Sequence, residues 1–147
     1  METQTELKME TQTEIAKHIA IEAHAGQVRK LGDDKGKPYI IHPERVANHF
    51  MNDTLCAAAW LHDVLEDCPG YSTKLLQDVG IHDDVIALVV LLTHDPTEKY
   101  VDYLIRIADN FEASQLKHAD LLDNLKSCPP GNMRDKYELA KYILENY

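Results

Sequence analysis

Apolar residues recur at the spacing of α-helices along most of the chain. Ile15, Ile19 and Ala23 stand four residues apart, which puts them on one face of a helix. The most apolar stretch, residues 55–67, is long enough for several helical turns and ends before a Pro-Gly pair. No segment keeps the two-residue alternation that is typical of a half-buried strand. The pattern therefore predicts an all-α fold.

Turn-forming residues divide this pattern into a compact bundle of about seven or eight helices. Proline favours the first turn of a helix and glycine its C-terminal end, and Pro43 and Gly80 mark two such boundaries. A turn-rich loop, residues 31–38, separates the first two helices. The predicted helices cover about residues 13–25, 43–51, 55–67, 73–79, 83–93, 97–107, 113–127 and 134–146.

Length and composition fit one domain. The 147 residues, of which 44% are hydrophobic and 27% charged, can bury a core without disulfides. Two near-identical hexapeptides, Met1–Glu6 and Met9–Glu14, are too short to be structural repeats. We expect residues 1–12 to form a flexible leader and residues 13–147 a single domain.

The formal net charge is −10, and an acidic surface repels nucleic-acid backbones and anionic lipids. We therefore expect no polymeric DNA or RNA partner. We expect no membrane association either, since the longest apolar run, residues 86–92, is too short to span a bilayer. The three cysteines form no C-x-x-C pair, and the N-terminus lacks the pattern of a signal peptide. These features predict reduced thiols in a cytoplasmic protein.

One of three His-Asp dipeptides has the features of a metal site. His62-Asp63 lies near the end of the most apolar predicted helix and is followed by Glu66 and Asp67. In a continuous helix these four side chains fall within an arc of about 140°. Burying so much charge is costly unless a cation compensates it. The alternative is a polar edge that faces solvent.

Other polar residues carry weaker signals. The His-Asp pairs at residues 82–83 and 94–95 mark the start and the end of a predicted helix. His42, next to Pro43, is well placed to point inward, although a lone histidine of this kind is more often a core residue than a ligand.

The predicted helix 113–127 has a polar face. Lys117, Asp120, Asn124 and Ser127 stand three or four residues apart and therefore share one side of the helix. Asp120 and Asn124 could hold a metal and a hydroxyl group, or the whole face could be a solvated stripe.

Taken together, these motifs resemble the hydrolase domain of RelA/SpoT-type proteins, an HD-domain metal-dependent phosphohydrolase, and especially the stand-alone small alarmone hydrolases. The resemblance extends from about residue 23 to residue 127. It rests on ordered blocks with fitting gaps, which are Gly26-Gln27-Val28-Arg29-Lys30, Pro38-Tyr39-Ile40-Ile41-His42-Pro43, His62-Asp63-Val64-Leu65-Glu66-Asp67, Leu91-Leu92-Thr93, and Lys117-His118-Ala119-Asp120 with Asn124.

The resemblance implies a role for each matching residue. The residues that match the family's metal-binding positions are His42, His62, Asp63 and Asp120. Glu66 and Asp67 match its catalytic positions, and Arg29, Lys30 and Asn124 match positions that contact the nucleotide. The implied reaction is hydrolysis of the 3′-pyrophosphate of guanosine tetra- or pentaphosphate, (p)ppGpp, with manganese as the usual metal.

The donor set and the local charge agree with this reaction. Two histidines and two carboxylates suit Mn²⁺ or another divalent ion such as Fe²⁺, Co²⁺ or Zn²⁺. In an acidic chain a polyphosphate ligand needs a local basic surface. Residues 26–49 supply one, with the cations Arg29, Lys30, Lys35, Lys37 and Arg45. Lys35 and Lys37 are explained equally well as solvated loop residues.

The chain departs from the family pattern at a few positions. About four extra residues stand between Lys30 and Pro38, and Cys68 replaces a usual threonine. Leu121 stands where a basic residue is common, and Asp123 where a histidine or an aromatic residue is common. We expect these departures to leave metal binding intact and to bear on the substrate.

Two alternatives to the alarmone remain open. One is a phosphatase acting on another nucleotide, such as NADPH or a deoxynucleotide. The other is an inactive nucleotide-sensing or interaction module, against which the complete ligand set argues. The expected partner is a small nucleotide, and the sequence leaves the oligomeric state open.

Overall fold

The computed structural model describes residues 10–147. Most of the predicted leader, residues 1–9, lies outside this part. The described chain forms nine α-helices and a short 3-10 helix, η1. Their bounds are α2 (Gln12–Ala23), η1 (Gly32–Asp34), α3 (Ile41–Ala47), α4 (Asp53–Leu61), α5 (Val64–Asp67), α6 (Thr73–Asp78), α7 (Asp83–Leu92), α8 (Tyr100–Ala108), α9 (Phe111–Ser127) and α10 (Asn132–Asn146).

The all-α prediction is confirmed. In the described part, β structure is limited to an isolated bridge between Val28 and Pro38, in the loop between α2 and α3. None of the described helices has the length and the hydropathy needed to cross a membrane.

Several helices begin at the capping residues that the sequence offers. Thr11 and Glu14 form a capping box at the start of α2, and the Ser72 hydroxyl accepts a backbone hydrogen bond at the start of α6. Such caps satisfy amide groups that have no partner within the helix. Helix α3 differs from its prediction, because it starts two residues before Pro43 and ends at Ala47. His42 therefore lies inside its first turn.

The predicted helix over residues 55–67 is divided in the structure. Helix α4 ends at Leu61 and α5 begins at Val64, with His62 and Asp63 between them. Asp63 has φ −104° and ψ −2°, in the sparsely populated bridge region where many active-site residues lie. The arc of about 140° expected for a continuous helix therefore does not apply, and the division raises the number of helices.

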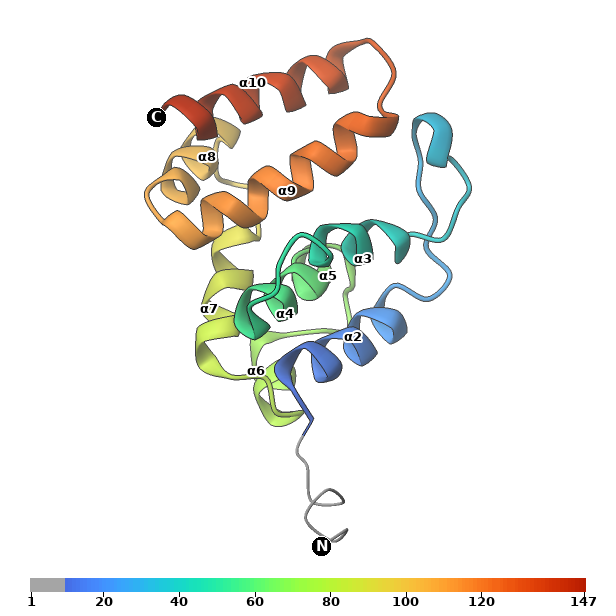
Figure 1. Ribbon diagram of the computed structural model, residues 1–147, viewed down its shortest axis with the longest axis vertical. Coiled ribbons are helices and arrows are strands. Elements are labelled where there is room, and N and C mark those ends of the chain that lie inside the picture. The colour runs from blue at the N-terminus through green and yellow to red at the C-terminus, as the bar shows by residue number, and fades with distance from the viewer. Residues whose placement is uncertain (1–9) are drawn as a thin grey trace, which may run out of the picture.

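Helix α4 is the centre of the bundle. Its residues from Ala57 to Leu61 are buried, and it packs against α2, α3, α7 and α9. Trp60 is the single tryptophan of the chain and is 5% exposed. Lys17 of α2 places its Nζ 5.8 Å from the ring centroid of Trp60. Helix α9 in turn packs against α3 and α4 on one side and against α8 and α10 on the other (Figure 1).

The loop between α2 and α3 closes against the C-terminal end of α9. Gly32 has φ +66°, and a Cβ atom at this position would lie 1.3 Å from the carbonyl oxygen of Ser127. Glycine is therefore required both by the backbone conformation and by the close approach. The buried carboxylate of Asp34 forms an ion pair with Arg45 of α3. The loop is thus fixed to two helices, α3 and α9.

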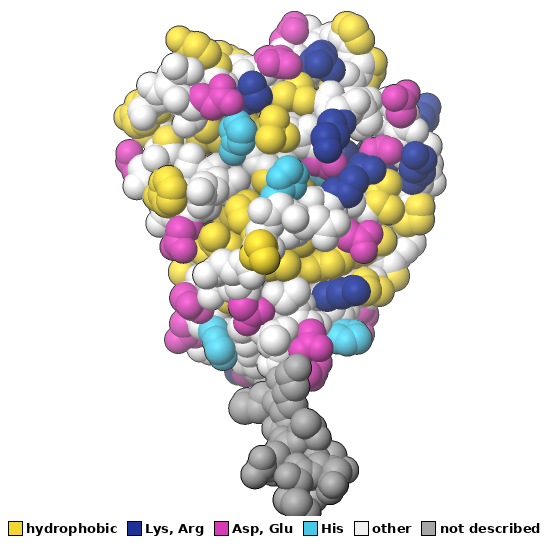
Figure 2. Space-filling model, in the orientation of Figure 1, with side chains coloured by type: hydrophobic (Ala, Val, Ile, Leu, Met, Phe, Trp, Pro, Cys, Tyr) yellow, Lys and Arg dark blue, Asp and Glu magenta, His cyan; other side chains and the backbone are white. Residues whose placement is uncertain are grey.

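Basic side chains are unevenly distributed over the surface. On the face shown in Figure 2, most of the Lys and Arg side chains gather in the upper half, toward one side. In the lower part of the same face, Asp, Glu and His side chains outnumber those of Lys and Arg. This distribution agrees with a local basic surface on an acidic protein.

Candidate metal centre and adjoining pocket

The four predicted metal ligands converge at one point of the bundle. His42 lies in the first turn of α3, His62 and Asp63 lie between α4 and α5, and Asp120 lies in α9. Each residue offers one ligand atom, and these atoms all lie within 4.8 Å of one another. No other group of three or more such side chains comes together in residues 10–147.

Hydrogen bonds at the far side of both imidazole rings direct Nε2 into the cluster. Nδ1 of His62 donates to the carbonyl oxygen of Ala59 at 2.7 Å, and Nδ1 of His42 donates to Asp123 at 2.6 Å. Because a carbonyl and a carboxylate accept hydrogen bonds, each Nδ1 carries the hydrogen and Nε2 is left to bind a metal. Nε2 of His62 is buried and lies 3.0 Å from Asp63 Oδ2 and 3.3 Å from Asp120 Oδ1.

The electrostatics of the cluster favour a cation. Burial disfavours the charged form of His62, but Asp63 and Asp120 outweigh it and raise the pKa of the ring well above its ordinary value. Burial also acts against charge on His42, whose pKa is nevertheless raised by hydrogen bonds to Asp120 and Asp123. A divalent ion supplies positive charge in place of these protons. The donor set, two imidazoles and two carboxylates, fits such an ion.

Two further side chains hold the carboxylates of the cluster. Tyr39 donates its hydroxyl to Asp63 Oδ2 at 2.5 Å, and burial raises the pKa of the phenol, so that it stays a donor. Nζ of Lys117 donates to Asp120 Oδ2 at 2.8 Å. Burial disfavours the charge on Lys117, but Asp120 outweighs it and raises the pKa of the amine well above its ordinary value. Both residues stand in motif blocks, although no role was predicted for either of them.

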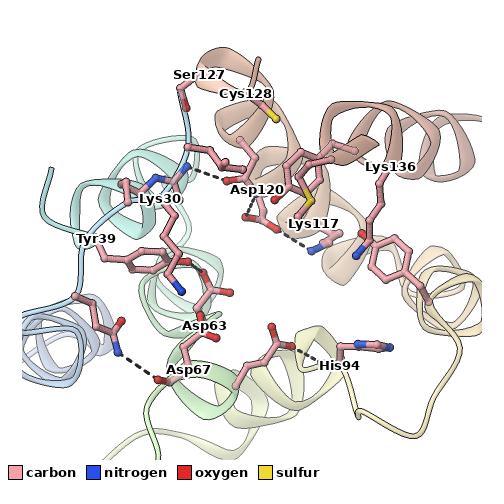
Figure 3. Close-up of a pocket in the computed structure, with 18 of the residues that line it drawn as sticks. Lys30, Tyr39, Asp63, Asp67, His94, Lys117, Asp120, Ser127, Cys128 and Lys136 are labelled. Carbon is pink, nitrogen blue, oxygen red and sulfur yellow. Dashed lines mark hydrogen bonds and ion pairs between the residues drawn. The ribbon is translucent and has the colours of Figure 1, made fainter. Parts of the chain in front are cut away.

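A cavity of about 610 Å³ opens beside the cluster, a volume typical of sites for small molecules. The predicted site residues that line it are Arg29, Lys30, Asp63, Glu66, Asp67, Asp120 and Asn124. Aromatic and basic residues that the sequence did not single out as a group line it too, namely His94, Tyr100, Tyr103, Lys117, Lys136 and Tyr137. Lys30 and Tyr39 lie on one side of Asp63, and Lys117, Lys136 and His94 lie on the other (Figure 3).

Glu66 and Asp67 lie in the wall of this cavity, on α5. The Glu66 carboxylate accepts the backbone N–H of His94 at 2.7 Å, which connects α5 to the loop after α7. Burial, together with the charges of Asp63 and Glu66, raises the pKa of Asp67 to about 6. A carboxyl group with a pKa this close to neutral can exchange a proton during a reaction near pH 7.

The predicted nucleotide contacts are joined to the metal cluster. Nη2 of Arg29 donates to Asn124 Oδ1 at 2.9 Å, and Asn124 Nδ2 donates to Asp120 Oδ1 at 3.2 Å. The guanidinium of Arg29 also lies 5.5 Å from the ring centroid of Tyr39. Lys30 is exposed at the edge of the cavity.

The structure also gives the positions of the polar face of α9 and of the two remaining His-Asp pairs. All four residues of that face line the cavity, so it is not a solvated stripe. The pair at residues 82–83 is exposed at the start of α7, as predicted. The pair at residues 94–95 follows the end of α7, as predicted, but His94 additionally contributes to the cavity wall.

The basic window contributes less to the cavity than expected. Of its five cations, Arg29 and Lys30 line the cavity. Arg45 and Lys37 instead form ion pairs with Asp34, which holds them within the loop region.

Two of the departures from the family pattern, Leu121 and Asp123, do not line the cavity. Leu121 is fully buried in the core, and Asp123 is 1% exposed and bound to His42. Asp123 contacts His42 because its position on α9 points it toward α3.

Comparison with known proteins agrees with these observations. No family model matches the chain. A guanosine-3′,5′-bis(diphosphate) 3′-pyrophosphohydrolase of Aquifex aeolicus is 31% identical over 144 residues, which cover 90% of this chain and 20% of the relative. Its counterpart in Vibrio cholerae is 32% identical over 144 residues, covering 88% and 20%. A probable GTP pyrophosphokinase of Mycobacterium leprae is 35% identical over 121 residues, covering 74% and 15%.

The chain spans 20% of the length of the pyrophosphohydrolases that it matches. It shares its fold with a solved structure described as a metazoan ortholog of SpoT that hydrolyses ppGpp. The TM-score is 0.72 and the identity 24%, over 93% of this chain and 85% of that chain. The resemblance to RelA/SpoT-type hydrolases and the HD-type helical fold are both confirmed.

Proposed function

We propose that this chain belongs to the RelA/SpoT-type HD hydrolases and removes the 3′-pyrophosphate from guanosine tetra- or pentaphosphate in a metal-dependent reaction. The observation that carries the proposal is the convergence of four metal-binding side chains beside a cavity of nucleotide size. The relatives similar to the chain over 88–90% of its length are named for this activity, which favours the guanosine alarmone over other nucleotides.

His42, His62, Asp63 and Asp120 are the residues that would hold the metal ion. Their mixed nitrogen and oxygen donors suit Mn²⁺, and also Fe²⁺, Co²⁺ or Zn²⁺. When bound, a divalent ion lowers the pKa of a coordinated water and polarises a phosphoryl oxygen.

The protein's own groups supply the acid–base chemistry and the positioning. Asp67, with a pKa of about 6, is mostly ionised at neutral pH and can accept the proton of the attacking water. Glu66, held by the backbone N–H of His94, orients the same water. Lys117 and Lys136 bring positive charge to the opposite wall of the cavity, where it can balance phosphate oxygens.

Binding of the nucleotide falls to residues at some distance from the attacked phosphorus. The planar guanidinium of Arg29, which lies 5.5 Å from the ring centroid of Tyr39, can stack on a purine face. Asn124 lies one turn beyond Asp120 on α9 and can hydrogen-bond a ribose or phosphate oxygen. Lys30 can pair with a phosphate at the edge of the cavity.

The proposed site lies within residues 13–147, which we propose form a single hydrolase domain. The expected partner is a small nucleotide in the cytoplasm. The formal charge of −10 acts against binding of polymeric nucleic acid or anionic membranes.

A substrate panel in the presence of Mn²⁺ tests the proposal. We expect kcat/KM for the alarmone to exceed the values for NADPH and deoxynucleoside triphosphates by tenfold or more, with pyrophosphate as the released product. EDTA and Asp120→Ala should abolish turnover, whereas Asp83→Ala, in the exposed His-Asp pair, should not.

Two results would contradict the proposal. If the alarmone is turned over no better than NADPH or the deoxynucleotides, the alarmone assignment is wrong and another nucleotide phosphatase is favoured. If no compound is turned over although Mn²⁺ binds, the chain is a sensing module rather than an enzyme.

A further inference from the structure

We infer that Asp123 is the positioning residue of the ligand His42, and that Arg45 and Asp34 hold Asp123 in place. The loop between α2 and α3 thereby contributes to metal affinity. The inference rests on the proposed metal site and concerns residues that stand outside the motif blocks and do not line the cavity.

Asp123 contacts the ring of His42 directly. The imidazole of His42 lies between two carboxylates from one turn of α9. Nε2 is 2.8 Å from Asp120 Oδ1, and Nδ1 is 2.6 Å from Asp123 Oδ2. Residues three apart on a helix share a face, so α9 presents both the neighbouring ligand and the support of the ring. A hydrogen bond at the far nitrogen of a metal-binding histidine fixes its tautomer and its orientation.

Arg45 holds the other oxygen of the Asp123 carboxylate. Asp123 is 1% exposed, and Nε of Arg45 lies 2.8 Å from Asp123 Oδ1. The guanidinium of Arg45 thus gives the buried carboxylate a partner of permanent positive charge. Because a carboxylate accepts hydrogen bonds only, Asp123 keeps the hydrogen of His42 on Nδ1 and leaves Nε2 to bind the metal.

Arg45 is in turn held by the loop between α2 and α3. Nη2 of Arg45 lies 2.5 Å from Asp34 Oδ2, and Asp34 is 6% exposed. The loop itself is fixed against α9 by the contact between Gly32 and Ser127. Asp34 therefore orients the guanidinium that orients Asp123.

This chain of contacts does not involve the nucleotide side of the site. Asp34, Arg45 and Asp123 are absent from the described residues that line the cavity. We therefore expect their effect on the reaction to pass through His42 and the metal.

The test is a titration of the full chain with Mn²⁺, followed by the electron paramagnetic resonance signal of the free ion. Removing a carboxylate that supports a metal-binding histidine weakens metal affinity by about 10- to 100-fold, and we expect this loss for Asp123→Leu. Asp123→Asn keeps an oxygen that accepts from His42 and should lose less than Asp123→Leu. Asp34→Asn should weaken Mn²⁺ binding severalfold. Asp33→Asn removes the same charge from an exposed neighbour in the same loop and should bind as the wild type does.

A nitrogen-15 NMR spectrum of the histidines adds a readout that a merely structural role would not move. In the wild-type protein we expect a protonated Nδ1 signal for His42 with Zn²⁺ as a diamagnetic ion, and a change of that signal in Asp34→Asn. Should Asp123→Leu fail to fold, the Asp34→Asn variant in the loop carries the test.

The outcomes separate this inference from the proposed function. A wild-type chain that binds no Mn²⁺ overturns the metal site itself. A wild-type chain that binds Mn²⁺, with Asp123→Leu and Asp34→Asn binding it equally well, overturns the role of Asp123 and leaves the proposed function standing.

Discussion

The proposed metal ion should act as a cross-link between helices, since its ligands come from α3, the junction of α4 and α5, and α9. An unfolded chain does not hold these side chains together, so the ion binds the native state alone. Such binding stabilises the native state by mass action. We therefore expect the melting temperature to rise with the concentration of Mn²⁺ and to fall when the metal is chelated.

The size of the chain sets the magnitude. Unfolding entropy is about 2.1 cal/mol/K per residue, which for 147 residues gives about 0.3 kcal/mol/K. One kcal/mol of added stability then raises the melting temperature by about 3 °C. Above the dissociation constant, each tenfold rise in free Mn²⁺ adds about 1.4 kcal/mol. The expected slope is therefore about 4–5 °C per tenfold rise in Mn²⁺.

Calorimetric or circular-dichroism melting over three decades of Mn²⁺ measures this slope. Asp120→Asn removes one ligand with little change in shape and should shift the rise in melting temperature to higher Mn²⁺ concentrations, because its dissociation constant is larger. Asp120→Asn also leaves the buried amine of Lys117 without its carboxylate, so its melting temperature without metal should fall as well. Asp83→Asn makes the same change at the exposed start of α7 and should keep the wild-type slope.

The Mn²⁺ concentration at which the melting temperature begins to rise, rather than the absolute melting temperature, decides the question. If this concentration is the same for Asp120→Asn and the wild type, Asp120 is not a ligand. If the wild type shows no rise although Mn²⁺ binds, the unfolded chain binds the ion equally well, and the ion is not a cross-link of the native state.

Further predictions concern rate, pH, affinity and folding. Glu66→Gln and Asp67→Asn should each lower kcat by about 10²-fold or more with Mn²⁺ content unchanged; loss of the metal instead would make the residue a ligand. In the wild type, kcat should fall as the pH drops through about 6, because a protonated Asp67 cannot accept a proton, and Asp67→Asn should lack this decline. Arg29→Ala and Asn124→Ala should mainly raise KM for the alarmone and spare metal content, whereas a selective loss of kcat would place them in the chemical step. Gly32→Ala should lower the melting temperature, because its Cβ would meet the Ser127 carbonyl; an unchanged value would show that the loop can move away.

The sequence was sufficient to predict the cluster of four side chains, because histidines and carboxylates are rare in apolar surroundings. His62 and Asp63 end a strongly hydrophobic segment, and neither residue type is buried without a partner. His42 and Asp120 were weaker candidates by themselves. Only the order and spacing of the motif blocks, compared with the family, indicated that they act together with His62 and Asp63.

The division between α4 and α5 could not be predicted from local sequence. The residues on both sides of His62 and Asp63 favour a helix, so propensity and periodicity continue through the break. Tertiary packing overrides that preference here, and it places Asp63 in a backbone conformation that a continuous helix does not offer.

The role of Asp123 was missed for a different reason. Asp123 and Asn124 are neighbours on α9, and the sequence shows two polar residues within one turn. Which of them faces the cavity depends on how α9 is rotated against α3. In the structure Asn124 faces the cavity and Asp123 faces His42.

The single tryptophan gives the molecule a built-in optical probe. Trp60 is buried in the central helix, two residues before His62. Its emission in the native state should lie at shorter wavelength than in the unfolded chain, because the ring is shielded from water. A paramagnetic ion such as Mn²⁺ bound at His62 should quench that emission. Unfolding and metal uptake can therefore be distinguished in one unlabelled sample, by the wavelength and by the intensity of the same fluorescence band.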